Sequence, residues 1–139
     1  MLEDYLMELE LRGQSKNTIR NYSYTLSNFF DFIGKNPESV TESDIKRYMI
    51  YLKNEKNATN RTIHRHLNAI RSFFRYQNLS IADKVMLPKL SKPLPKFLTK
   101  EEMALLLGAP DKLRDKCIIR ILYSTGLRVS ELVKLNKND

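Results

Sequence analysis

The chain has 139 residues, 42% of them hydrophobic, which is enough for one ordinary domain or two small ones with a packed core. Its 24 lysines and arginines outnumber its 16 acidic residues, so the net charge of +8 favours a polyanionic partner such as nucleic acid. The single cysteine excludes an intrachain disulfide, and two histidines without partner cysteines give no zinc set, so we expect neither metal nor cofactor. No apolar run approaches the roughly 20 residues of a membrane span, and the acidic start MLEDYLMELELRG does not resemble a signal peptide. We therefore expect a cytoplasmic, all-α protein with no membrane partner.

Three amphipathic helices are predicted before Asn57, because apolar residues recur there every three or four positions. Their boundary signals are, in chain order, Leu2 with Gly13, Ser15 or Asn17 with Gly34, and Thr41 or Ser43 with the acid Asp44. The second of these helices carries a long aromatic face, with Tyr22, Phe29 and Phe30, which predicts that it is packed in the core.

The fourth predicted helix, from about Thr59 or Asn60 to Gln77, carries two opposed faces. Its apolar positions recur with the helical period and predict a buried face made of Ile63, Leu67, Ile70 and Phe74. The other side, which we call the basic stripe, consists of Arg61, His64, Arg65, Asn68, Arg71 and Arg75. Most charged faces are merely solvated. This one has no acid from Asn57 to Ala82 and accepts repulsion between arginines four residues apart, so phosphate binding is the interpretation we prefer.

The composition changes after residue 79. Residues 80–96, SIADKVMLPKLSKPLPK, contain three of the five prolines, which predicts a linker between domains at 1–79 and 97–139. Thr99 and Glu102 form a capping box for a short fifth helix. A sixth helix is predicted from about Lys112 to Thr125. Cys117 lies on the apolar stripe of this helix, where core packing is expected rather than a nucleophilic role.

The stretch STGLRVSEL, residues 124–132, contains the most distinctive charged residue of the second domain. Gly126 ends one helix and the next begins at once, so Arg128 is expected near a helix N-terminus, where an arginine suits a phosphate group. Glu131, one turn later, can hold the guanidinium in place. From this spacing alone, an ordinary surface pair of arginine and glutamate is the commoner arrangement, and this alternative stays open here.

Two long segments of the chain resemble the tyrosine recombinases, particularly their Xer-type and integrase-like members. These segments are YLMELELRGQSKNTIRNYSYTLSNFFDFI with NRTIHRHLNAIRSFFRY, and LPKFLTKEEMALLLGAP with LRDKCIIRILYSTGLRVSELVKL. The resemblance implies a SAM-like four-helix core-binding domain, followed by the first helices of a catalytic domain that is mixed α+β when complete. It also implies double-stranded DNA as partner, tetramers on two duplexes, and strand exchange through a 3′-phosphotyrosyl link without metal or cofactor.

The resemblance also implies roles for individual residues. Arg128 matches the first catalytic arginine, which binds the scissile phosphate, and Glu131 matches the acid that supports it. The family places DNA against its second and fourth helices, and the DNA-binding residues predicted there are Lys16, Asn17, Thr18, Arg20, Arg61, Thr62, His64, Arg65, Arg71 and Arg75.

The chain departs from the family pattern after Arg128. The lysine hairpin, the His-x-x-Arg box and the nucleophilic tyrosine all follow this point in the family, whereas all seven tyrosines here precede it. We therefore expect an N-terminal portion of a recombinase that does not cleave DNA alone. Two alternatives stay open: a truncated, non-catalytic DNA-binding regulator of recombination, and an all-α module whose basic face binds an acidic protein.

Overall fold

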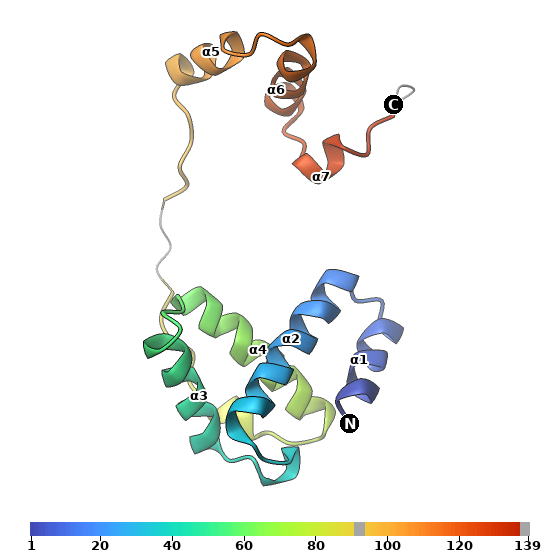
Figure 1. Cartoon of the computed structure of the whole chain (residues 1–139), viewed down its shortest axis with the longest axis vertical. Coiled ribbons are helices and arrows are strands. Elements are labelled where there is room, and N and C mark those ends of the chain that lie inside the picture. Colours follow the sequence, from blue (N-terminus) through green and yellow to red (C-terminus); the bar gives the residue numbers. More distant parts are fainter. Residues whose placement is uncertain (91–93, 137–139) are drawn as a thin grey trace. The chain divides into compact units, whose positions relative to one another are not determined.

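A computed structural model of the protein describes residues 1–90 and 94–136. Within these residues all regular elements are helices and no strand occurs, so the all-α prediction is confirmed (Figure 1). The chain divides into two compact units, residues 1–92 and 93–139.

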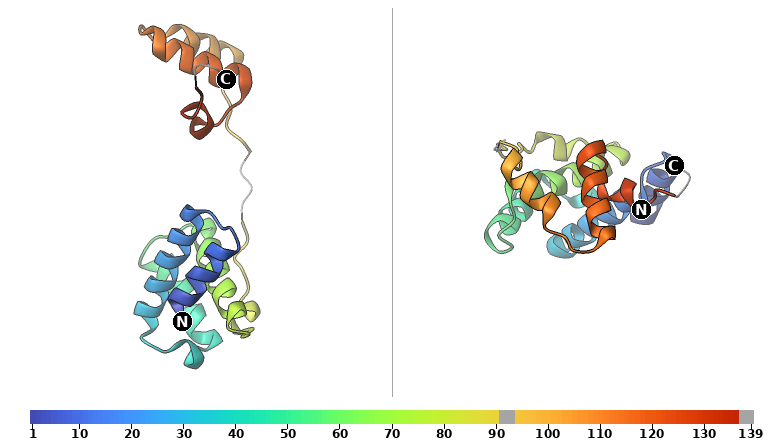
Figure 2. Two further views of the ribbon diagram at one scale, coloured as in Figure 1. Left: turned by 90° about the vertical axis from the view of Figure 1, so that its right-hand side faces the viewer. Right: turned by 90° about the horizontal axis from the view of Figure 1, so that it is seen from above.

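The first unit is built from four α-helices that share one core, seen from two further directions in Figure 2. Its elements are α1 (Leu2–Leu11), α2 (Lys16–Ile33), the 3-10 turn η1 (Pro37–Ser39), α3 (Glu42–Asn54), α4 (Asn60–Tyr76) and the 3-10 turn η2 (Ile81–Lys84). Helix α2 contacts α1, α3 and α4, and it is therefore the central helix of the unit.

The helix boundaries follow the signals in the sequence. The Ser15 hydroxyl accepts a hydrogen bond from the backbone N–H of Thr18 at the start of α2. The Thr59 hydroxyl does the same for Thr62 at the start of α4. Gly34 ends α2 with a left-handed φ of 58°, a conformation that costs a glycine little.

The core of the first unit is strongly aromatic. The Phe29 ring lies 5.2 Å from that of Tyr48 and 6.4 Å from that of Phe74, in edge-to-face contacts that join α2, α3 and α4. Tyr5 of α1 contacts Phe73 in the same way at 5.4 Å. The predicted buried face of α4 is confirmed, because Ile63, Leu67, Ile70 and Phe74 are all buried.

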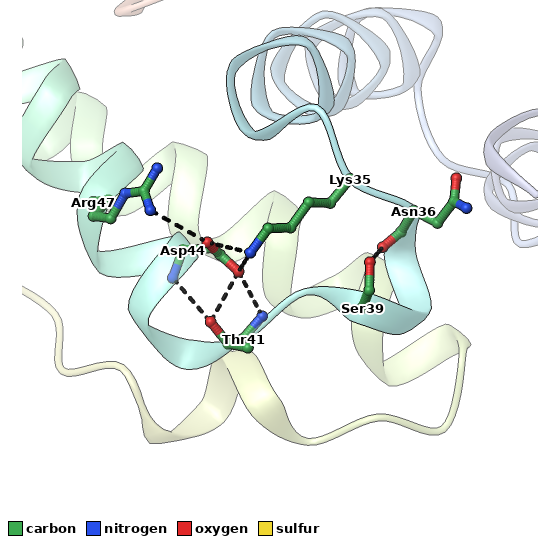
Figure 3. A network of polar contacts seen from close by, with 6 residues as sticks. All are labelled: Lys35, Asn36, Ser39, Thr41, Asp44 and Arg47. Carbon is green, nitrogen blue, oxygen red and sulfur yellow. Dashed lines mark hydrogen bonds and ion pairs between the residues drawn. The ribbon is translucent and has the colours of Figure 1, made fainter.

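A buried carboxylate fixes the start of α3. Asp44 accepts hydrogen bonds from the backbone N–H of Thr41 at 3.0 Å and from its hydroxyl at 2.8 Å, which completes the predicted capping box (Figure 3). The Lys35 ammonium, from the loop after α2, donates to both carboxylate oxygens at 2.8 and 2.9 Å. Hydrogen bonds from Lys35 and then from Thr41 lower the pKa of Asp44 from 3.8 to about 2. This network links α3 to the end of α2.

The beginning of the segment predicted to be a linker packs on the first unit. Ala82 and Val85 belong to the core, with exposed fractions of 1% and 3%, and η2 contacts both α3 and α4. Proline-rich sequence starts only at Pro88, so apolar residues on either side of Asp83 can extend the core before the composition becomes that of a linker.

The second unit contains α5 (Lys100–Gly108), α6 (Leu113–Thr125) and the single turn α7 (Val129–Leu132). The predicted capping box of Thr99 and Glu102 is present at the start of α5. None of the residues described in these three helices is buried. The expectation that Cys117 packs in a core is therefore wrong for this chain: Cys117 is exposed, because three short helices do not enclose the apolar side of α6.

Candidate nucleic-acid interface

Four cationic side chains on α2 and α4 are available to bind a polyanion. Lys16 and Arg20 lie in the first half of α2, and Arg61 and Arg65 lie in the first half of α4. All four are exposed, and within the described part of the chain none of them forms a hydrogen bond or an ion pair. Helices α2 and α4 contact each other and cross in Figure 1, and Arg65 lines the space between them.

A groove of about 300 Å³ separates the first halves of these two helices. We call it the α2–α4 groove; it is lined by Asn21, Tyr22, Tyr24, Thr25, Thr62, Arg65, His66 and Asn68. No carboxylate is among these lining residues. The groove therefore combines one guanidinium with amide and hydroxyl groups, which are groups that proteins use to contact the phosphates and base edges of DNA.

The far end of the basic stripe is differently arranged. Arg71 donates from Nε to the Ala82 carbonyl oxygen at 3.1 Å and from a terminal nitrogen to the Val85 carbonyl oxygen. Arg75 donates from Nε and Nη2 to Asp83, with Nη2–Oδ1 at 2.8 Å. The Arg75 guanidinium lowers the pKa of Asp83 by hydrogen bonding and by its charge. These two arginines hold η2 against α4, so their guanidinium groups already have partners.

Two further polar residues of α4 hold the chain after η2. His64 Nε2 contacts the carbonyl oxygen of Pro88, and the Asn60 amide donates to the carbonyl oxygen of Lys89 at 2.9 Å. His64 is therefore half-buried against this segment rather than fully presented to solvent.

His66 lies on the packed side of α4. Its Nδ1 is 3.2 Å from the Tyr48 hydroxyl, and burial lowers the pKa of the imidazole. Burial also raises the pKa of the Tyr48 hydroxyl. Burial therefore favours the neutral form of both groups, and the pair joins α3 to α4, while His66 also lines the α2–α4 groove.

In the second unit, Arg128 and Glu131 form the predicted pair. The Glu131 carboxylate accepts from the Arg128 backbone N–H at 2.7 Å and from Nη1 of its guanidinium at 2.9 Å. Both bonds lower the pKa of Glu131, and the bond from the Arg128 backbone has the larger effect. The Arg128 side chain is 82% exposed, so a guanidinium held at one edge by Glu131 has its other donors free.

The turn before Arg128 has the form that the sequence predicts. Gly126 ends α6 with a left-handed φ of 68°, and the Leu127 N–H donates to the Thr125 hydroxyl at 3.3 Å. Helix α7 has only four residues, so the potential of its N-terminus is small and the guanidinium itself has to supply the positive charge.

The structure brings together polar residues that the sequence did not relate to one another. The sequence placed Asn68 on the basic stripe without a role and gave Asn21 no place in a site; the structure brings both into the α2–α4 groove. The role of Asp83 as a partner of these arginines could have been suspected, since Asp83 is the first acid after the four arginines of the fourth predicted helix.

None of the helices described is long and apolar enough to cross a membrane.

Comparisons with known proteins match almost the whole chain. A family described as "Phage integrase, N-terminal SAM-like domain" matches residues 1–78, and the "Phage integrase family" matches residues 96–139. Tyrosine recombinase XerA of Pyrococcus horikoshii is 41% identical over 100% of this chain and 47% of its own length. Tyrosine recombinase XerD of Halalkalibacterium halodurans is 36% identical over 92% of this chain and 48% of its own.

A solved structure gives the same picture. The crystal structure of a XerA recombinase superimposes with a TM-score of 0.58 and 27% identity, over 99% of this chain and 50% of the other. The chain thus spans about half the length of the relatives it matches.

Proposed function

Because the chain belongs to the phage integrase family, we propose that it binds duplex DNA as the N-terminal part of a site-specific tyrosine recombinase. The resemblance to Xer-type recombinases that the sequence suggested is confirmed by relatives that match along the whole chain. The observation that carries the proposal is the set of four exposed cations in the first halves of α2 and α4, none of which has a partner among the described residues and one of which, Arg65, lines the α2–α4 groove.

Unpaired cations are the groups that gain most from a phosphate backbone. Each one that meets a phosphate releases condensed counterions, and none has to break an internal ion pair first. Arginine can also bind two phosphate oxygens at once. We therefore assign the main phosphate contacts to Lys16, Arg20, Arg61 and Arg65. Neutral donors lie beside them in the first turns of the same helices and can add hydrogen bonds to the DNA backbone; these are Asn17, Thr18 and Thr62.

His64, Arg71 and Arg75 have a secondary place in this proposal. Each contacts the segment after α4, and the side chain of Arg71 is only 19% exposed. Arg75 is 66% exposed and can meet a phosphate on its outer side while it keeps Asp83. Their first role is to hold η2 and the residues after it on α4.

Arg128 is proposed as the phosphate-binding group of the second unit. During strand exchange negative charge shifts among the oxygens of the scissile phosphate, and an arginine already held in position stabilises that charge without further reorganisation. Glu131 supplies the positioning through its bond to Nη1. In a full recombinase, working as a tetramer on two duplexes, the attacking tyrosine would come from sequence outside these 139 residues, because all seven tyrosines here precede Arg128.

The test is the salt dependence of DNA binding. Fluorescence anisotropy with a labelled duplex should show the logarithm of the binding constant falling with the logarithm of salt concentration. Four phosphate contacts at about 0.9 each predict a slope of roughly −3.6. Polyglutamate of matched length serves as competitor. A slope near zero, or equal competition by polyglutamate, would instead favour the protein-interaction module.

A further inference from the structure

We propose that Asn21 and Asn68 read base edges in the major groove and give this chain its sequence preference, an inference that rests on the DNA binding proposed above. Both side chains line the α2–α4 groove, one from each helix. Both residues are exposed, and neither amide forms a hydrogen bond within the residues that the structure describes. The groove thus presents two unoccupied amides from two different helices.

The chemistry of an amide differs from that of the cations around it. A primary amide presents a donor and an acceptor side by side, which matches the N6 and N7 atoms of adenine in the major groove. Lysine and arginine on phosphates fix the position of the protein but carry no sequence information. A surface with cations alone would therefore bind DNA without preference, whereas the two asparagines add a pattern that one base pair satisfies better than the others.

The placement of the asparagines relative to the cations supports this division of roles. Asn68 follows Arg65 by three residues and Arg61 by seven, so the three side chains share one face of α4. On α2, Asn21 lies about 100° around the helix from Arg20 and lines the groove together with Tyr24 and Thr25. A duplex held by these cations would bring its bases toward the amides, and no carboxylate in the lining of the groove would repel it.

Helix stability gives no reason for asparagine at either position. Asparagine is a poorer helix former than alanine, and both residues lie inside their helices rather than at a cap. Since neither amide forms a hydrogen bond with another of the described residues, alanine at these positions should leave the unit folded. Thermal unfolding followed by circular dichroism checks that each variant keeps its fold.

The experiment is a binding selection from duplexes with a randomised core, using the 139-residue chain. Asn21→Ala and Asn68→Ala should each lose the preference for adenine at one position, by roughly 5- to 150-fold. The salt slope of both variants should stay that of the parent chain, because no phosphate contact is removed. Asn54→Ala, at an exposed asparagine of α3 outside the groove, is the matched control and should change neither quantity.

Each alternative outcome has a distinct meaning. If the parent chain binds duplexes but both alanine variants enrich the same sequences as the parent, base reading by these asparagines is refuted while DNA binding stands. A uniform loss of affinity with a shallower salt slope would show that they contact phosphates, which also refutes the inference. If the parent chain binds no duplex at all, the proposed function fails with it.

Discussion

Replacing Arg61 and Arg65 together by alanine should weaken DNA binding and flatten its dependence on salt. Neither guanidinium has an internal partner among the described residues, so both are free to neutralise phosphates. Loss of two contacts at about 0.9 each should reduce the magnitude of the slope by about 1.8. A counterion term of that size corresponds to roughly 60-fold in affinity near 0.1 M salt.

The same helix offers a matched control in Arg71 and Arg75. The double change to alanine removes the same formal charge, but from groups that already bind Ala82, Val85 and Asp83. Its effect on the salt slope should therefore be clearly smaller. Its effect on stability should be larger, because two backbone carbonyls and one carboxylate lose their donors.

Anisotropy titrations of both double variants against one labelled duplex, at several salt concentrations between about 50 and 300 mM, measure the two slopes directly. Urea unfolding of the same samples measures the two stabilities. Equal reductions of the slope in both variants would refute the distinction between free and engaged arginines. If the slope of the Arg61 and Arg65 double variant equals that of the parent chain, the start of α4 is not part of the interface.

Three further outcomes are expected. The free energy of unfolding should fall by about 2 kcal/mol as the pH drops from above 4 to about 2, because the pKa of Asp44 is lowered from 3.8 to about 2 in the folded state. The unfolded chain therefore takes up this proton at a higher pH than the folded chain does. In urea unfolding, Asp44→Asn should be less stable than the parent chain at pH 6 and less dependent on pH, and an equally steep pH dependence in that variant would contradict this. Val85→Ala should cost about 1 to 3 kcal/mol in the same assay if the segment after α4 is part of the core, whereas a linker residue would cost almost nothing. The chain should form no covalent adduct with a nicked suicide duplex on a denaturing gel, and a retarded band would show that one of its seven tyrosines can act as nucleophile.

The two faces of α4 could be predicted from the sequence because they depend on helical period alone. Burial of Leu67 and exposure of Arg61 both follow from the angle of each residue around the helix axis. Caps such as Ser15 and Thr41 are equally local, because their partners lie three residues away.

The contacts that the sequence did not predict join residues far apart in the chain. The bonds of Arg71 to Ala82 and Val85 depend on how the chain returns after α4, which no periodicity describes. The α2–α4 groove needs two helices to cross, so Asn21 could not be related to Asn68 beforehand. For Cys117 the sequence predicted a contact that the structure lacks. Helix α6 does have an apolar stripe, but a stripe is buried only if other elements cover it, and Cys117 is exposed.

Because of Asp83, the net positive charge along α4 is greater near the start of the helix than near its end. The arginines near the start of the helix keep their full charge, while Arg75 near its end is compensated by a carboxylate and Arg71 by two carbonyl dipoles. The attraction for a polyanion should therefore increase from Tyr76 toward Asn60 rather than being uniform along the helix. A polyanion that first meets this surface would be drawn toward the start of α4, so a single acid near the other end can help to set the orientation in which a duplex is bound.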